Sequence, residues 1–166
     1  MPPRRPISAL DKALRLLSAR AYSSGELSLR LIRAGYPSEE AVAAIEECRK
    51  RHYLDDRMFA EDCAGMWLER GHGARSIRLK LRQRGISSEL AADVLSISSE
   101  DETEAACRAI ESKLPSLLRE KDLRKRKAKA LRFLAARGFA GEAVGAAMQH
   151  LAASGASTDG DSLPDS

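Results

Sequence analysis

The sequence predicts an all-α protein in which three tandem three-helix repeats stack into an elongated, curved body. Two observations lead to this fold class. A helical run that ends in Leu, three further residues, Gly and a large apolar residue occurs three times, 50 and 53 residues apart, at Leu31–Tyr36, Leu81–Ile86 and Leu134–Phe139. No segment shows the sustained alternation or the β-branched enrichment of a strand. A unit of about fifty residues can hardly bury its own apolar face, so neighbouring repeats must supply the missing contacts.

Upstream of each repeated segment lies another run of apolar residues at helical spacing. The three runs are Leu10, Leu14 and Leu17; Phe59, Cys63, Met66 and Trp67; and Ala106, Ile110 and Leu114. Each repeat therefore holds three helices, and the repeats span residues 9–52, 53–98 and 99–152. Residues 1–8 are expected to form a disordered N-terminal segment. Residues 153–166, which are rich in Gly, Ser and Asp and lack apolar periodicity, are expected to form a disordered acidic tail.

Each repeated segment combines a stop signal for one helix with a start signal for the next. Glycine takes the left-handed backbone past a helix without strain, and in a Schellman cap the Leu four residues earlier meets the apolar residue that follows. The three glycines are Gly35, Gly85 and Gly138. Three residues after them come the residues that can cap the next helix, Ser38, Ser88 and Gly141. A glutamate follows each, at the positive end of the helix dipole.

Composition and cysteine spacing narrow the class of protein. Of the 166 residues, 43% are hydrophobic but only 4% are aromatic, so the core must rely on Leu, Ala and Ile. No apolar stretch approaches about eighteen residues and the first residues hold no apolar signal core, so we expect a soluble, cytoplasmic protein. We also expect the chain to be a monomer. Cys48, Cys63 and Cys107 are odd in number and lack Cys-x-x-Cys spacing, which favours reduced, buried thiols over disulfides or zinc ligands.

Positive charge is concentrated in two segments. Residues 70–84 hold six bases and no acid, and residues 119–137 hold nine bases against two acids. The bases that share one helix face are Arg75, Arg78 and Arg82 in the first segment and Lys125, Lys129 and Arg132 in the second. A run of charge is usually a solvated helix face, but its repetition at equivalent places favours a binding surface along the repeats.

Patterns typical of catalysis and of metal binding are absent from the sequence. The three histidines lie far apart, and there is no phosphate loop, dinucleotide fingerprint or nucleophile elbow. The acidic pair Asp55 and Asp56 is interpreted as a helix start, with Asp55 as the N-cap and with Leu54 and Phe59 as a hydrophobic staple. A metal site or acid catalysis at this pair is the alternative. We expect no enzymatic activity, no cofactor and no metal.

One part of the sequence resembles a known family. Tyr53-Leu54-Asp55-Asp56 and Phe59-Ala60 are followed by Gly71-x-Gly73 and by Ile77-Arg78-x-x-Leu81-x-x-Arg84-Gly85-Ile86. This combination resembles the central signature of the RecX regulatory proteins, a family with tandem three-helix repeats, and the resemblance extends more loosely over residues 9–151. Two positions depart from the pattern: Trp67, where the family usually has Arg, and Lys80, where it usually has an acid.

The resemblance implies a function. RecX-like proteins lie in the groove of the helical filament that RecA recombinase forms on single-stranded DNA. They inhibit its recombinase, ATPase and co-protease activities, and thereby modulate DNA repair and the SOS response. No catalytic residue is implied. From the placement of charge, we assign the surface that contacts the filament or the DNA to Arg75, Arg78, Lys80, Arg82, Arg84, Arg124, Lys125, Arg126, Lys129 and Arg132.

Two other functions are compatible with the residues alone. A helix-turn-helix transcription regulator would read duplex DNA through the helix after one of the glycine turns. Those helices begin with Glu39 and Glu40, with Glu89 and with Glu142, which phosphates repel. A helical scaffold for some other acidic protein is the second alternative, and only a binding assay separates it from a regulator of RecA.

Overall fold

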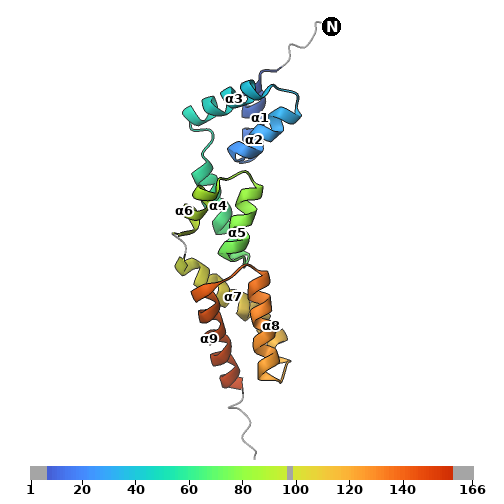
Figure 1. The fold of residues 1–166 in the computed structure, drawn as a ribbon, viewed down its shortest axis with the longest axis vertical. Coiled ribbons are helices and arrows are strands. Elements are labelled where there is room, and N and C mark those ends of the chain that lie inside the picture. The colour runs from blue at the N-terminus through green and yellow to red at the C-terminus, as the bar shows by residue number, and fades with distance from the viewer. Residues whose placement is uncertain (1–6, 97–98, 159–166) are drawn as a thin grey trace, which may run out of the picture. The chain divides into compact units, whose positions relative to one another are not determined.

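The structure is a computed structural model that describes residues 7–96 and 99–158. Over these residues the chain forms nine α-helices and no strand, so the all-α fold class is confirmed (Figure 1). The helices are α1 (Ala9–Ala19), α2 (Ser24–Arg33), α3 (Ser38–Lys50), α4 (Asp56–Glu69), α5 (Ala74–Gln83), α6 (Ser88–Ser96), α7 (Ser99–Leu118), α8 (Leu123–Ala136) and α9 (Gly141–Thr158). Helices α1 to α3, α4 to α6 and α7 to α9 make up the first, second and third repeat.

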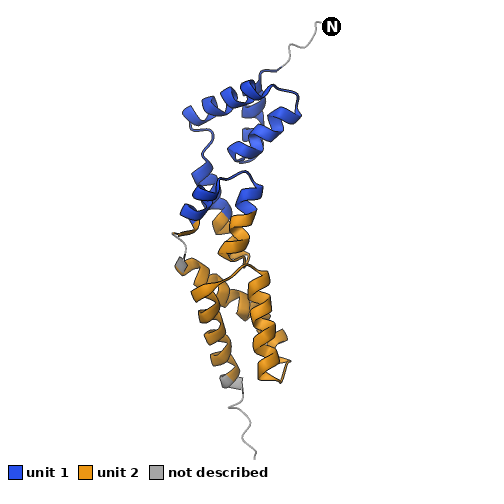
Figure 2. Cartoon of the chain, viewed as in Figure 1, with its two compact units in different colours: residues 1–63, 80–94 blue, residues 64–79, 95–166 orange. Residues whose placement is uncertain are grey.

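The chain divides into two compact units (Figure 2). Unit 1 consists of residues 1–63 and 80–94, and unit 2 of residues 64–79 and 95–166. The first repeat lies in unit 1 and the third in unit 2. The second repeat contributes to both, because α4 and α5 each cross the boundary between the units.

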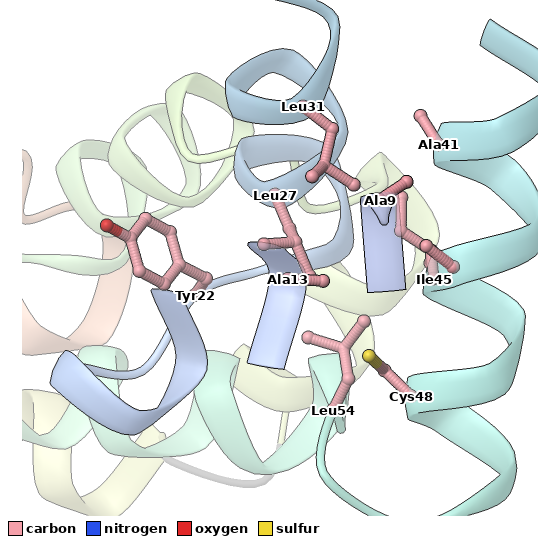
Figure 3. Packing of buried hydrophobic residues seen from close by; sticks show 10 residues of the cluster. Ala9, Ala13, Tyr22, Leu27, Leu31, Ala41, Ile45, Cys48 and Leu54 are labelled. Carbon is pink, nitrogen blue, oxygen red and sulfur yellow. The ribbon is translucent and has the colours of Figure 1, made fainter. Parts of the chain in front are cut away.

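In the first repeat, α1 packs against α2 and α3 around an apolar core (Figure 3). Leu27 and Leu31 of α2 and Ala13 of α1 are fully buried. A capping box begins α2: the Ser23 Oγ accepts from the Glu26 N–H at 3.1 Å, and the Glu26 carboxylate accepts from the Ser23 N–H at 3.5 Å. The core therefore holds one face of α2 and leaves the opposite face outward.

In the third repeat, α7 packs against both α8 and α9, and α8 also contacts α9. Ile110 and Leu117 of α7 and Leu134 of α8 are fully buried. The expected core positions Ala106 and Ile110 are confirmed, whereas Leu114 is only half-buried. Leu117, one turn further along α7, takes the buried place instead.

The three glycine turns have the geometry expected of Schellman caps. Gly35, Gly85 and Gly138 have φ angles of 93°, 79° and 86°, which lie in the left-handed region. The Tyr36 N–H donates to the Leu31 carbonyl oxygen at 3.2 Å, and the turns after α5 and α8 make the corresponding bond at 3.0 Å. The positions of the turns are therefore confirmed at all three sites.

The predicted caps of the following helices are one residue late. Ser38, Ser88 and Gly141 are the first residues of α3, α6 and α9 rather than their N-caps. Before α6 the cap is Ser87, whose Oγ accepts the backbone N–H three residues further on at 3.2 Å. Before α3 stands Pro37, which offers no side-chain cap. A hydroxyl reaches the third N–H of a helix only from the residue that precedes the helix.

The predicted disordered segment 1–8 is wrong for its last two residues. Ser8 is the N-cap of α1, and its Oγ accepts from the Asp11 N–H at 3.0 Å. The Ile7 carbonyl oxygen accepts from the Tyr36 hydroxyl at 2.7 Å. Residues 1–6 lie outside the described part of the chain.

The predicted tail 153–166 is wrong for its first six residues, because α9 continues to Thr158. Within this extension the Ser154 Oγ donates back to the His150 carbonyl oxygen at 3.0 Å. The hydroxyl thus has its hydrogen-bond partner inside the helix. Residues 159–166, with the three aspartates of the predicted tail, lie outside the described residues.

Candidate partner-binding surface

Helix α5 carries the first of two basic faces. Ile77 and Leu81 are fully buried, whereas Arg75, Arg78 and Arg82 are exposed. None of these three arginines has an ion-pair partner within the described residues. The predicted division of α5 into a core face and a basic face is therefore confirmed, and its guanidinium groups are available to a partner.

Helix α8 carries the second basic face. Leu134 is fully buried, whereas Arg124, Lys125, Lys129 and Arg132 are exposed. Two of these bases lie in the first turn of α8, at the positive end of the helix dipole. The Asp122 carboxylate caps this helix end, since it accepts from the Arg124 N–H at 2.8 Å and from the Lys125 N–H at 3.2 Å. An anionic partner would therefore be attracted by the exposed basic side chains rather than by free backbone N–H groups.

Other assigned bases of α8 make contacts within the chain. The Lys129 Nζ donates to the Ser116 carbonyl oxygen at 3.1 Å and to the hydroxyl of the same residue at 3.2 Å. The half-buried Arg126 donates from Nε to the Glu120 carbonyl oxygen at 2.9 Å. On α5, Lys80 is also half-buried. Lys129 is exposed and the other two are half-buried, but all three are less free to reorient toward a partner than bases without such contacts.

Arg84 lies where the first and second repeats meet. Its guanidinium forms an ion pair with Glu26, with one N···O distance of 3.2 Å, and stacks over the Phe59 ring at 4.8 Å from the centroid. The hydrogen bond to Glu26 raises the pKa of Arg84 above its usual value. We therefore assign Arg84 a structural role and leave it out of the contact surface proposed below.

Backbone contacts join the second and third repeats in unit 2. The Gly73 N–H donates to the Arg137 carbonyl oxygen at 2.8 Å, and the Arg75 N–H to the Gly138 carbonyl oxygen at 3.1 Å. A Cβ on Gly73 would lie 2.4 Å from the Phe139 nitrogen, so only glycine permits this approach. The turn that ends α8 thus lies against the start of α5, and the two basic helices meet end to end.

A corresponding contact joins the first and second repeats in unit 1. A Cβ on Gly25 would lie 2.8 Å from the Gly85 Cα, so the start of α2 and the turn after α5 approach as closely as backbones can. The fully buried Ser23 donates from Oγ to the Arg84 carbonyl oxygen. We call these two contacts the glycine joints.

At each glycine joint, a carboxylate also accepts a hydrogen bond from the first backbone N–H of a repeat's second helix, α2 or α5. Asp56 accepts from the Ser24 N–H at 2.7 Å, and Glu102 accepts from the Ala74 N–H at 2.8 Å. Asp55 is the N-cap of α4, as predicted: its Oδ1 accepts from the backbone N–H groups two and three residues further on, at 2.9 and 3.1 Å. Both members of the acidic pair therefore have structural partners.

The described residues contain no group of three or more His, Cys, Asp or Glu side chains that is arranged to hold a metal ion. None of the helices in this part of the chain is both long enough and apolar enough to cross a bilayer. Cys48 and Cys63 are buried, but Cys107 is half-buried, so the expectation of three buried thiols is wrong for Cys107. Burial raises the pKa of all three thiols.

These features define a tandem three-helix-repeat protein whose repeats meet through glycine joints and whose α5 and α8 expose bases. Models of the first, second and third three-helix domains of RecX match residues 9–48, 55–95 and 100–148. The chain therefore belongs to the RecX family of regulatory proteins, which are not enzymes.

Similar proteins support the family and the fold separately. Regulatory protein RecX of Chromohalobacter salexigens is 36% identical over 140 residues, which is 84% of this chain and 90% of that protein. Regulatory protein RecX of Chlorobaculum tepidum is 36% identical over 138 residues, covering 82% and 84%. The crystal structure of RecX from Lactobacillus salivarius matches with a TM-score of 0.80 over 87% of this chain and 95% of that one, at 20% identity. That last likeness concerns the fold alone.

Proposed function

We propose that this chain binds the filament that RecA forms on single-stranded DNA and inhibits its recombinase, ATPase and co-protease activities. Membership of the RecX family carries the proposal. In the cytoplasm, such inhibition would modulate homologous recombination, DNA repair and the SOS response. The chain would act by binding as a monomer, without a cofactor.

The exposed bases of α5 and α8 support this function. A filament on single-stranded DNA is a polyanion, and each base that neutralises a phosphate releases a condensed counterion. The contact surface that we propose consists of the exposed bases Arg75, Arg78, Arg82, Arg124, Lys125, Lys129 and Arg132, with the half-buried Lys80 and Arg126 beside them. No catalytic group is needed, because inhibition requires only that the filament be held or capped.

A transcription regulator would place different chemistry on the outside. In a helix-turn-helix protein the helix after the turn enters the major groove. The corresponding helices α3, α6 and α9 have acidic first turns, with Glu39 and Glu40 in α3, Glu89 in α6 and Glu142 in α9. Duplex phosphates would repel these ends, so sequence-specific binding to duplex DNA is not expected.

Hydrolysis of ATP by RecA tests the proposal directly. Substoichiometric amounts of the chain should lower the DNA-dependent ATPase rate of its cognate RecA, and micrographs should show shorter filaments. Bovine albumin at the same concentration controls for crowding. Unchanged hydrolysis at equimolar protein, together with filaments of normal length, would refute the proposed function.

The salt dependence of binding tests which bases contact phosphate. The two trios to replace with alanine are Arg75, Arg78 and Arg82 on α5, and Lys125, Lys129 and Arg132 on α8. If all six contact single-stranded DNA, the logarithm of the association constant should fall with the logarithm of the salt concentration with a slope of about −4. Each trio variant should make this slope less steep by about 2, to about −2. The loss should be the same for any base sequence, because phosphate contacts carry no sequence information. If neither variant changes the slope or the inhibition of RecA, both trios are solvated faces.

A further inference from the structure

The outward faces of the three second helices differ at equivalent positions. The repeat spacings of 50 and 53 residues align α2, α5 and α8 with one another. Opposite the core, the first aligned set is Leu29, Leu79 and Arg132, and the second is Ile32, Arg82 and Ala135. At these two positions the exposed side chains thus change from two large apolar residues in α2, through Leu and Arg in α5, to Arg and Ala in α8.

Helix α2 leaves two large apolar side chains in solvent. Leu29 is 55% exposed and Ile32 is 44% exposed, and they lie one turn apart on the side of α2 away from the buried Leu27 and Leu31. Leu79, which aligns with Leu29, is 56% exposed. Single exposed leucines are common on protein surfaces, but an adjacent pair whose first member recurs in the next repeat indicates a contact surface.

Two arginines flank this apolar pair. Arg30 and Arg33 are exposed, and neither side chain has an ion-pair partner within the described residues. An apolar centre with an arginine rim is typical of protein interfaces. Nucleic-acid phosphates stay hydrated and cannot cover Leu29 and Ile32, whereas a protein surface with an apolar hollow and nearby carboxylates satisfies all four side chains.

We propose that α2 contacts protein in the filament, with Leu29 and Ile32 in an apolar hollow rimmed by carboxylates on a RecA subunit, while α8 contacts the DNA. The inference rests on the function proposed above and adds to it a division of contacts between the helices. Helix α5 carries both chemistries, since it has Leu79 as well as its arginines. Helix α8 also exposes Leu123 and Leu131, but these align with Arg70 and Arg78 and not with apolar residues.

The test uses the full chain and a matched pair of variants. Leu29→Ser/Ile32→Ser removes the apolar pair, and Val42→Ser removes an apolar side chain that is 55% exposed on another helix, α3. Melting temperature and helical content by circular dichroism report that both variants are folded, independently of any binding assay. We expect the double variant to lose about tenfold or more in affinity for the RecA–DNA filament while its affinity for protein-free DNA stays at the wild-type value. Val42→Ser should match the wild type in both assays.

Three outcomes would overturn the inference. If the wild type inhibits RecA and the double variant inhibits it equally well, α2 is not the protein contact, although the proposed function stands. If the double variant loses affinity for protein-free DNA to the same extent, the α2 face contacts nucleic acid. If sedimentation shows a dimer that the double variant abolishes, the face binds a second copy of the chain. If the wild-type chain has no effect on RecA, the proposed function is refuted, and this inference, which rests on it, is refuted as well.

Discussion

The substitution Gly73→Ala should break the glycine joint of unit 2. The new Cβ would lie 2.4 Å from the Phe139 nitrogen and 2.5 Å from the Gly138 carbonyl carbon. Both are backbone atoms, so neither can move aside as the end of a flexible side chain could. The turn after α8 must therefore retreat from α5, and the bonds donated by the Gly73 and Arg75 N–H groups, 2.8 and 3.1 Å long, must lengthen or break.

The expected magnitude follows from these contacts. Two hydrogen bonds contribute about 0.5–1.5 kcal/mol each, and overpacking a well-filled contact costs about 1–3 kcal/mol. Together they should lower the free energy of unfolding by about 2–6 kcal/mol. Gly145→Ala in α9 is the matched control, because a Cβ there would meet no atom within 4 Å. It should raise the free energy of unfolding by about 0.5–1 kcal/mol through helix propensity alone.

Urea denaturation followed by circular dichroism measures both changes. The reasoning requires opposite signs: an earlier midpoint for Gly73→Ala and a later midpoint for Gly145→Ala. A Gly73→Ala protein as stable as the wild type would show that the turn does not lie this close to α5. Equal losses in both variants would show a general intolerance of added volume, with no special role for the joint.

Three further predictions concern the core, the tail and the thiols. Leu81→Ala should lower the free energy of unfolding by about 2–5 kcal/mol, because Leu81 is fully buried. Arg82→Ala on the exposed face should change it by less than about 0.5 kcal/mol. If thermal melting showed the larger loss for Arg82→Ala, the buried and exposed faces of α5 would be assigned the wrong way round. Removal of residues 159–166 should leave the melting temperature unchanged and strengthen binding to single-stranded DNA, because the truncation removes three negative charges from a basic protein. A lower melting temperature after truncation would show that the tail docks on the helices. Iodoacetamide should label the half-buried Cys107 before the buried Cys48. Both reactions should speed up as pH rises, because a raised pKa keeps each thiol protonated at neutral pH. Mass spectrometry of digests measures the order of labelling, and the opposite order would contradict the prediction.

Turns could be predicted from the sequence because their signals are local. A Schellman cap needs only a glycine in the left-handed region and a leucine four residues before it, and both are visible in the chain. The same holds for the Asp55 cap of α4. The ends of the folded part were harder to predict, because α9 continues through Ser154 and Gly155, which are weak helix formers.

Core positions were predicted less well in helices that pack through small residues. In α1 the buried residues are Ala9 and Ala13, while Leu10 and Leu14 are only half-buried around them. Small side chains let two helices approach closely, so the residue that is most enclosed need not be the largest. In α4, Met66 is exposed although it fits the apolar spacing. Periodicity gives the face of a helix but not its exact centre.

The glycine joints explain why a count of bases overstates the binding surface. Arg84 and Arg137 occupy equivalent positions, each one residue before a turn glycine, and both serve the joints: Arg84 pairs with Glu26, and Arg137 donates to the Arg70 carbonyl oxygen at 3.0 Å. The first repeat has Ala34 at this position.

The turn of the first repeat differs in its surroundings as well. A Cβ on Gly35 would meet no atom within 4 Å, whereas Gly85 and Gly138 lie against backbone. An arginine thus precedes the glycine at the two turns that dock and is replaced by alanine at the turn that does not. This correlation could have separated joint arginines from contact arginines in the sequence. Charge-removal experiments should therefore keep Arg84 and Arg137, because their loss would disturb the joints and would be mistaken for a loss of binding.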